Sequence, residues 1–185
     1  KGTFAVLLLY GALLLFMSGK FQESLPVKRR SKKSVLASFS LYAKVFKNRT
    51  YVLYFLVCTF PMIILFGYIA SSPFIYQKIY GLSPVGFSLC FALNALFTAF
   101  GCALSGKVGD ERKALKIAGV GMLVFAIAVA AALMTHALLP VLQVAFMGLT
   151  FMFGMSQPPA NALALNAERA NAGTAAAAIG ASGFL

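Results

Sequence analysis

Long stretches without a charged residue dominate the pattern of hydrophobic and polar positions along the chain. Five of them, 2–19, 51–71, 86–106, 117–135 and 138–157, are close to the length of a membrane span, and a sixth runs from 172 to 185. A helix rises ~1.5 Å per residue, so ~20 apolar residues cross the ~30 Å hydrocarbon core of a bilayer. Apolar and polar residues do not alternate here as they do in barrel strands. The pattern therefore predicts an all-α, polytopic transmembrane helix bundle.

Residues 20–50 interrupt this pattern. The first part of the segment is basic and we expect it to be flexible, whereas residues 34–47 place Leu36, Phe39, Tyr42, Val45 and Phe46 at helical spacing. This spacing, with lysines among the apolar positions, predicts an amphipathic helix on the membrane surface. We interpret the segment as a tether at a domain boundary, and a lipid-binding regulatory site is the alternative.

Basic residues are distributed unevenly among the predicted loops. The formal net charge is +12, and fourteen of the sixteen Lys and Arg residues lie within 20–50, 105–116 and 166–171. Because cytoplasmic loops are enriched in Lys and Arg, we expect these three segments in the cytoplasm and the loop around Tyr76–Leu82 outside. The positive charge then anchors an integral membrane protein in the bilayer and does not indicate nucleic-acid binding.

The residues that usually carry catalysis or bind metals are few. All four acids lie in the predicted cytoplasmic loops, and Cys58, Cys90 and Cys102 lie inside spans without a CxxC motif or a nearby His. The single His136 lies at a span end, where an interfacial role is favoured over a proton relay. The sequence therefore predicts no enzyme, no catalytic residue, no metal site and no cofactor.

Polar and proline residues are concentrated on the spans that begin at residues 51, 86 and 138. Polar groups are costly in lipid unless they face protein or water, so these spans are expected to line a cavity. For any one residue, a helix–helix contact is the alternative. An apolar, aromatic pocket with few polar groups suits a small amphipathic compound. The candidate substrate-binding residues are Phe60, Ile64, Tyr68, Ser71, Asn94, Phe146, Thr150, Phe151, Gly154, Gln157 and Asn161.

Several strings in the second part of the chain resemble one transporter family. Tyr-Ile-Ala-Ser-Ser-Pro-Phe-Ile-Tyr-Gln at 68–77, Tyr-Gly-Leu-Ser-Pro at 80–84 and Phe-Ser-Leu-Cys-Phe-Ala-Leu-Asn-Ala at 87–95 look like its seventh span, outer loop and eighth span. Pro-Pro-Ala-Asn-Ala-Leu-Ala-Leu at 158–165 and Ala-Gly-Thr-Ala-Ala-Ala at 172–177 look like its connection between spans ten and eleven. The family is the bicyclomycin/chloramphenicol-resistance (Bcr/CflA) group of drug:H⁺ antiporters in the major facilitator superfamily.

The resemblance implies an organisation for the whole chain. Residues 1–19 would be the last span of the N-terminal half of a twelve-span fold, and 20–50 the cytoplasmic linker. Residues 51–185 would be the C-terminal half, truncated in its fifth span, so we expect the chain to be an interior piece of a longer protein. The implied function is export of drug-like compounds, and thereby antibiotic resistance, by alternating access in the bacterial cytoplasmic (inner) membrane. We expect a monomer with the proton as coupling ion, and the titrating carboxylate would lie in the N-terminal half.

Two segments are candidates for gating. Residues 106–113 resemble the superfamily's glycine-containing basic loop between paired spans, which implies gating roles for Gly106, Asp110 and Arg112. Pro158 and Pro159 interrupt helical hydrogen bonding and predict a kink near a cytoplasmic gate. A metabolite transporter of the same fold and a non-transporting structural or sensor subunit remain alternatives to drug export.

Overall fold

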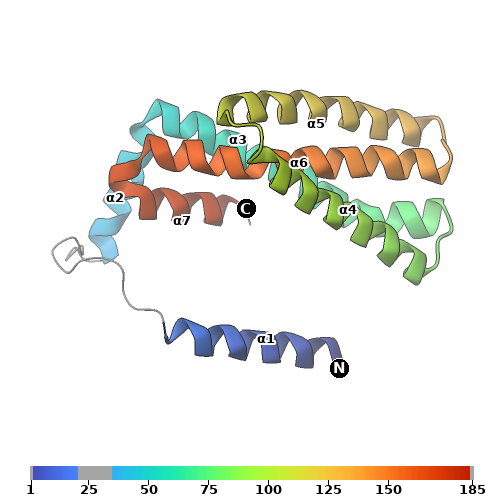
Figure 1. Ribbon diagram of the computed structural model, residues 1–185, viewed down its shortest axis with the longest axis horizontal. Coiled ribbons are helices and arrows are strands. Elements are labelled where there is room, and N and C mark those ends of the chain that lie inside the picture. Colours follow the sequence, from blue (N-terminus) through green and yellow to red (C-terminus); the bar gives the residue numbers. More distant parts are fainter. Residues whose placement is uncertain (1, 21–34, 184–185) are drawn as a thin grey trace. The chain divides into compact units, whose positions relative to one another are not determined.

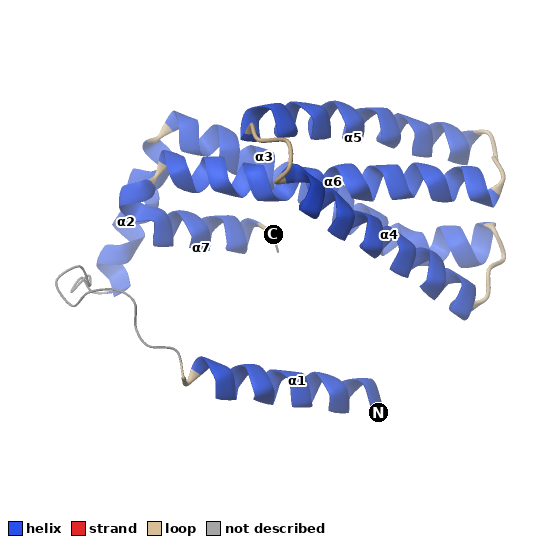
Figure 2. Ribbon diagram, in the orientation of Figure 1, coloured by secondary structure: helices blue, strands red, loops and turns tan. Residues whose placement is uncertain are grey.

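The computed structural model describes residues 2–20 and 35–183, except for the side chains of Thr3 and residues 35–39. All regular structure in these residues is helical (Figures 1 and 2). The elements are α1 (Gly2–Ser18), α2 (Val35–Lys47), α3 (Arg49–Phe74), the π-helix η2 (Ile75–Ile79), α4 (Pro84–Ser105), α5 (Glu111–Met134), α6 (Leu139–Ala167), the 3₁₀ turn η3 (Arg169–Asn171) and α7 (Ala172–Ser182).

The chain divides into two units, residues 1–37 and 38–185. The first contains α1, an apolar helix of 17 residues whose large side chains are exposed. Residues 21–34 of the expected linker 20–50 lie outside the described residues. A helix does form where the amphipathic spacing predicts one, since α2 covers Val35–Lys47.

Four helical segments in the described residues are long and apolar enough to cross a membrane: Arg49–Ile79, Pro84–Ser105, Glu111–Met134 and Leu139–Ala167. They confirm an all-α bundle of membrane-spanning helices. The third begins at Glu111, ahead of the charge-free stretch, because the Asp110 side chain accepts hydrogen bonds from the Arg112 and Lys113 amides and caps the helix there. Hydropathy marks the part of a helix that lies in hydrocarbon and does not mark its ends.

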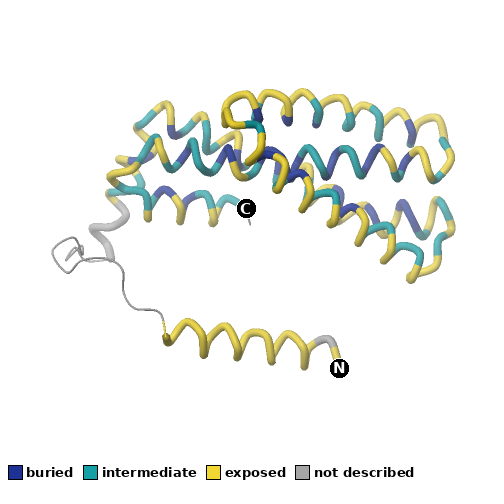
Figure 3. The backbone as a smooth tube through the Cα atoms, viewed as in Figure 1, coloured by how far each residue is buried: buried dark blue, intermediate teal, exposed yellow. Residues whose placement is uncertain are grey.

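Helix α6 lies at the centre of the second unit. It packs against α3, α4, α5 and α7, and buried positions recur along its whole length (Figures 1 and 3). Helices α4 and α6 approach closely at two glycines, because a Cβ on Gly101 would overlap the Phe151 carbonyl and a Cβ on Gly154 would overlap the Thr98 carbonyl. Small residues permit such backbone contact between helices in a membrane.

The segment after Pro73 differs from the sequence prediction. Tyr76 was expected in an outer loop, but η2 continues the helix to Ile79 and Tyr76 is fully buried. Pro73 cannot donate to the Ile69 carbonyl, and the Ser72 hydroxyl donates to that oxygen at 3.3 Å instead. The chain then turns at Gly81, whose φ of 67° favours glycine.

Helix α6 also passes through its prolines. It runs without a break to Ala167, so Pro158 and Pro159 do not end it, and the kink remains a prediction. Pro158 has no N–H for the Gly154 carbonyl, and the Cys102 thiol of α4 donates to that oxygen at 3.2 Å. The neighbouring helix thus partners a backbone group that the proline leaves free.

Candidate functional site

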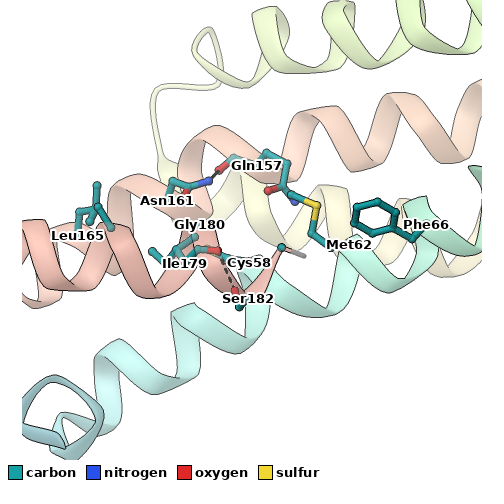
Figure 4. Close-up of a pocket in the computed structure, with 11 residues that line it drawn as sticks. Cys58, Met62, Phe66, Gln157, Asn161, Leu165, Ile179, Gly180 and Ser182 are labelled. Carbon is teal, nitrogen blue, oxygen red and sulfur yellow. Dashed lines mark hydrogen bonds between the residues drawn. The ribbon is translucent and has the colours of Figure 1, made fainter. Parts of the chain in front are cut away.

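A cavity of about 400 Å³ lies between α3, α6 and α7 (Figure 4). Its wall is mostly apolar and combines side chains from three helices, of which α3 is distant in sequence from the other two. They include Cys58, Met62 and Phe66 from α3, Gln157, Asn161 and Leu165 from α6, and Ile179, Gly180 and Ser182 from α7. Two of the sequence-predicted residues, Gln157 and Asn161, meet here.

Two hydrogen bonds attach α7 to α3 beside this cavity. The Tyr51 hydroxyl donates to the Ala175 carbonyl at 2.9 Å, and the Thr59 and Ser182 hydroxyl oxygens are 3.0 Å apart. Between these contacts α7 contributes mainly Ala and Gly, which have little side-chain volume. The small side chains leave the space that forms the cavity.

Gln157 presents the least satisfied polar group in this wall. Its Nε2 is buried and has no hydrogen-bond partner among the described residues. Asn161 differs, because its Nδ2 donates to the Gln157 backbone carbonyl at 2.9 Å. Leaving a buried donor unpaired costs ~1–3 kcal/mol, so this amide is a locally unfavourable feature of α6. Gln157 and Met62 point toward one another from α6 and α3 (Figure 4).

A buried polar network connects α3, η2, α4 and α6 elsewhere in the bundle. The Asn94 Nδ2 donates to the Tyr68 hydroxyl at 2.7 Å, and the Gln143 Nε2 donates to the Asn94 Oδ1 at 3.1 Å. The Tyr76 hydroxyl donates to the Gln143 Oε1. Asn94 is 1% exposed, so these bonds satisfy polar groups that would otherwise be buried without partners.

A second cavity, of about 240 Å³, adjoins this network. It is lined by Leu65, Tyr68, Ile69, Phe91, Asn94, Ala95, Thr98 and Thr150. The Tyr68 ring stacks on Phe91 with their centroids 5.7 Å apart. Three predicted residues, Tyr68, Asn94 and Thr150, therefore share this smaller space and do not line the cavity that contains Gln157.

The other predicted wall residues are dispersed. The Phe146 ring is buried, 5.0 Å from the Tyr68 ring, and Gly154 lies in the contact with α4. Phe151 lines an apolar groove with Phe97 and Phe125. The remaining three lie on exposed surface of α3: Phe60, Ile64 and Ser71, whose hydroxyl donates to the Gly67 carbonyl at 2.6 Å.

The predicted gating residues have local structural roles. Asp110 caps α5, with its Oδ1 accepting at 2.8 Å from the Arg112 amide, while the Arg112 side chain is exposed. Gly106 follows α4 at a φ of −67°, which any residue can adopt. The position in this loop that favours glycine is Gly109, at a φ of +74°.

One polar cluster was absent from the sequence prediction. The Asn48 Nδ2 donates to the Glu168 Oε1 at 2.8 Å and to the Ala167 carbonyl at 2.9 Å, while the Asn171 Nδ2 donates to the Glu168 Oε2 at 3.1 Å. The Asn48 hydrogen bond, then that from Asn171, holds the pKa of Glu168 below its usual range, and the charge of Lys44 adds to this effect. The cluster fixes the start of α3 to the connection between α6 and α7.

The sequence analysis selected neither the Asn48–Glu168 cluster nor several residues that line the cavity between α3, α6 and α7, because these residues look ordinary in sequence. Met62 and Phe66 resemble lipid-facing side chains, and Ser182 lies inside an Ala/Gly run. Asn48 carries a weak signal, since an Asn ahead of an apolar run is a typical helix cap. Nothing in the spacing indicates that it also reaches Glu168.

Comparisons with known proteins agree with this architecture. A family profile described as "Major Facilitator Superfamily" matches residues 2–185. The chain is 30% identical over 181 residues to a Bacillus subtilis (strain 168) protein named "Uncharacterized MFS-type transporter YdgK". The match covers 96% of this chain and 45% of that protein, so the chain spans less than half the length of this relative. No solved structure matches.

The profile match covers nearly the whole chain, including the helices that form both cavities. The similarity to an MFS-type transporter extends over almost the same residues. The chain belongs to the Major Facilitator Superfamily of membrane transporters.

Proposed function

We propose that the protein to which this chain contributes exports small, amphipathic, drug-like compounds across the bacterial inner membrane. The observation that carries the proposal is the cavity between α3, α6 and α7, with its mostly apolar walls. Such a site suits compounds of low polarity and permits weak selectivity. The resemblance of residues 68–95 and 158–177 to the Bcr/CflA drug transporters supports the same direction of transport.

The proposed mechanism is alternating access. Transporters of this type open a site near the middle of the membrane to one side and then to the other. In this proposal α3 and α6 supply part of the substrate wall, and the basic segment 20–50 lies in the cytoplasm and joins two helical halves. The protein works as a monomer, and movement of one half against the other exposes the bound compound to either side.

We further propose that proton entry drives export. Coupling requires a group whose charge changes at membrane depth, usually a carboxylate. All four acids of this chain lie outside the predicted charge-free stretches, so the proposal places the titrating group in another part of the full-length protein.

Export can be tested with the full-length protein in a bacterial host that lacks its own drug pumps. Cells are loaded with ethidium and other amphipathic dyes, and accumulation is measured with and without a protonophore. The proposal predicts lower accumulation in expressing cells and loss of this difference with the protonophore. Unchanged accumulation of every dye, with the protein present in the membrane, contradicts drug export, and uptake of a metabolite in its place favours the metabolite alternative.

A further inference from the structure

An apolar groove follows one face of α6, where α4 and α5 both pack against that helix (Figure 1). It encloses about 520 Å³ and is lined by Phe97 from α4, Phe125 from α5 and a stretch of α6 that includes Val144, Gly148 and Phe151. Gly148 lets the Phe125 ring lie directly on α6, because a Cβ there would overlap that ring. No polar side chain lines the groove, so its occupant is apolar.

The groove ends beside a lysine. A smaller space of about 220 Å³ is lined by Phe100, Ala103, Leu104, Lys107 and Phe151. Phe151 lines both spaces, so they are contiguous. Lys107 lies just past the end of α4 at Ser105, and its side chain is exposed. In the described part of the chain, no ion pair or side-chain hydrogen bond occupies the Lys107 ammonium group.

The length of the groove matches one leaflet of a bilayer. Phe97 and Ser105 are eight residues apart, which corresponds to ~12 Å along a helix, and Lys107 lies slightly beyond. Half of the hydrocarbon core is ~15 Å thick. An acyl chain from one leaflet therefore fits along the groove and places its headgroup beside Lys107. A membrane-spanning peptide helix would need about twice this length.

The charge at this end of the groove favours an anionic headgroup. The segment 105–116 has two acids, Asp110 and Glu111, against four basic residues: Lys107, Arg112, Lys113 and Lys116. The Asp110 carboxylate already accepts hydrogen bonds from the backbone amides of residues 112 and 113. Basic sites between membrane helices attract anionic lipid headgroups.

We infer that the groove formed by α4, α5 and α6 binds a phospholipid with an anionic headgroup. The lipid phosphate contacts the Lys107 ammonium group, and one acyl chain lies against Phe97, Phe125 and Phe151. None of these residues lines the cavity between α3, α6 and α7, so the lipid site goes beyond the proposed export function.

A tryptophan in the groove can report which lipid lies beside it. The chain has no Trp, and Phe100→Trp places one next to Lys107 with little change in shape. The full-length protein, with Trp elsewhere replaced by Phe, is reconstituted in mixtures of dioleoyl-phosphatidylglycerol, which is anionic, and dioleoyl-phosphatidylcholine, which is zwitterionic. One of the two lipids carries brominated chains. Bromine quenches nearby Trp fluorescence, so quenching measures the relative affinity of the two lipids at residue 100. We expect phosphatidylglycerol to be preferred about fivefold, the effect of one lysine near a membrane surface.

Two charge variants test the headgroup contact. In the Phe100→Trp protein, Lys107→Gln should abolish most of the preference for phosphatidylglycerol. Lys116→Gln removes an equal charge from the second turn of α5, outside the groove, and should keep the preference. A separate reporter, Val120→Trp, is exposed on α5 outside the groove and should show little preference. Phe97→Trp is the second groove reporter if Phe100→Trp does not fold.

Each contrary result removes a defined part of the inference. Equal affinity of the two lipids at the groove reporter would overturn the selection of an anionic headgroup. A preference that persists in Lys107→Gln would overturn the role of Lys107. Equal losses in Lys107→Gln and Lys116→Gln, or an equal preference at Val120→Trp, would show a general attraction of anionic lipid to a basic surface and overturn the groove as a site. These outcomes do not depend on whether the protein exports dyes.

Discussion

Glycine positions determine how closely the helices of the second unit approach one another. Gly101 and Gly154 place the backbones of α4 and α6 in direct contact, whereas a Cβ on Gly119 of α5 would meet nothing within 4 Å. The sequence shows all three as glycines inside apolar stretches. Only the packing distinguishes a glycine that permits contact from one that does not.

Replacing Gly154 with Ala should destabilise the protein. The added methyl overlaps the Thr98 carbonyl, which belongs to the α4 backbone and cannot move without shifting that helix. Overpacking of this kind costs ~1–3 kcal/mol. Thermal unfolding of the purified full-length protein should therefore shift to lower temperature. The matched variant Gly119→Ala should unfold at or slightly above the wild-type temperature, and equal losses in both would refute the packing argument.

Site residues were predictable only where their polarity is unusual for a membrane span. Gln157 and Asn161 stood out in this way and do share the cavity between α3, α6 and α7. The same criterion also selected Asn94 and Tyr68, which satisfy one another's hydrogen bonds near the smaller cavity. Polarity shows that a residue needs a partner, but it does not show whether that partner is protein or ligand.

At the scale of elements, the apolar stretches predict each helix between residues 49 and 182 but misplace several ends. The charge-free stretch ends at residue 71 and a loop was expected around Tyr76–Leu82, but the helix continues past Pro73 through η2 to Ile79. Helix α6 extends to Ala167, ten residues past the expected end of its apolar stretch. In both places, groups from the same or a neighbouring helix partner carbonyls that the prolines leave free, and a one-dimensional pattern contains no record of such partners.

The two prolines of α6 should matter for transport. Changing both Pro158 and Pro159 to Ala restores the missing N–H groups, so the Gly154 carbonyl no longer needs the Cys102 thiol. We expect a stiffer α6 and export slowed by up to about tenfold at matched protein amounts, a change in barrier of ~1.4 kcal/mol. Pro140→Ala, in the first turn of α6 where proline is well tolerated, is the control. Wild-type export by the double variant would exclude a role for these prolines in gating.

The contact between the α3 start and the α6–α7 connection should make stability depend on pH. The pKa of Glu168 is lowered in the folded state, so its ionised form stabilises the fold at neutral pH. This contribution is lost as the pH falls from the ordinary value of 4.5 through the lowered value. Glu168→Gln should therefore unfold at lower temperature than wild type at pH 7, and the two curves should converge below about pH 4.5. A difference that stays constant down to pH 3 would show that the charge of Glu168 is not involved.

At the scale of the whole molecule, the distribution of basic residues predicts the orientation in the membrane. Lys113 lies in the first turn of α5, in one of the basic segments expected in the cytoplasm. Lys78 lies in η2, next to the loop expected outside the cell. Both side chains are exposed. In intact cells expressing a cysteine-free full-length protein, a membrane-impermeant maleimide should label Lys78→Cys and not Lys113→Cys. After permeabilisation both should react. Labelling of Lys113→Cys and not of Lys78→Cys in intact cells would show that the orientation in the membrane is opposite to the one proposed.

The central claim is that the cavity between α3, α6 and α7 holds the exported compound, and ligand protection of a cysteine at Asn161 tests it most directly. In the cysteine-free protein, N-ethylmaleimide should modify Asn161→Cys, which lines the cavity, and Glu111→Cys, which is exposed at the start of α5 outside it. The dye exported best in the accumulation assay should slow modification at residue 161 in proportion to its occupancy and leave residue 111 unaffected. Unchanged modification at residue 161 under saturating dye, in protein that still exports that dye, would contradict the account.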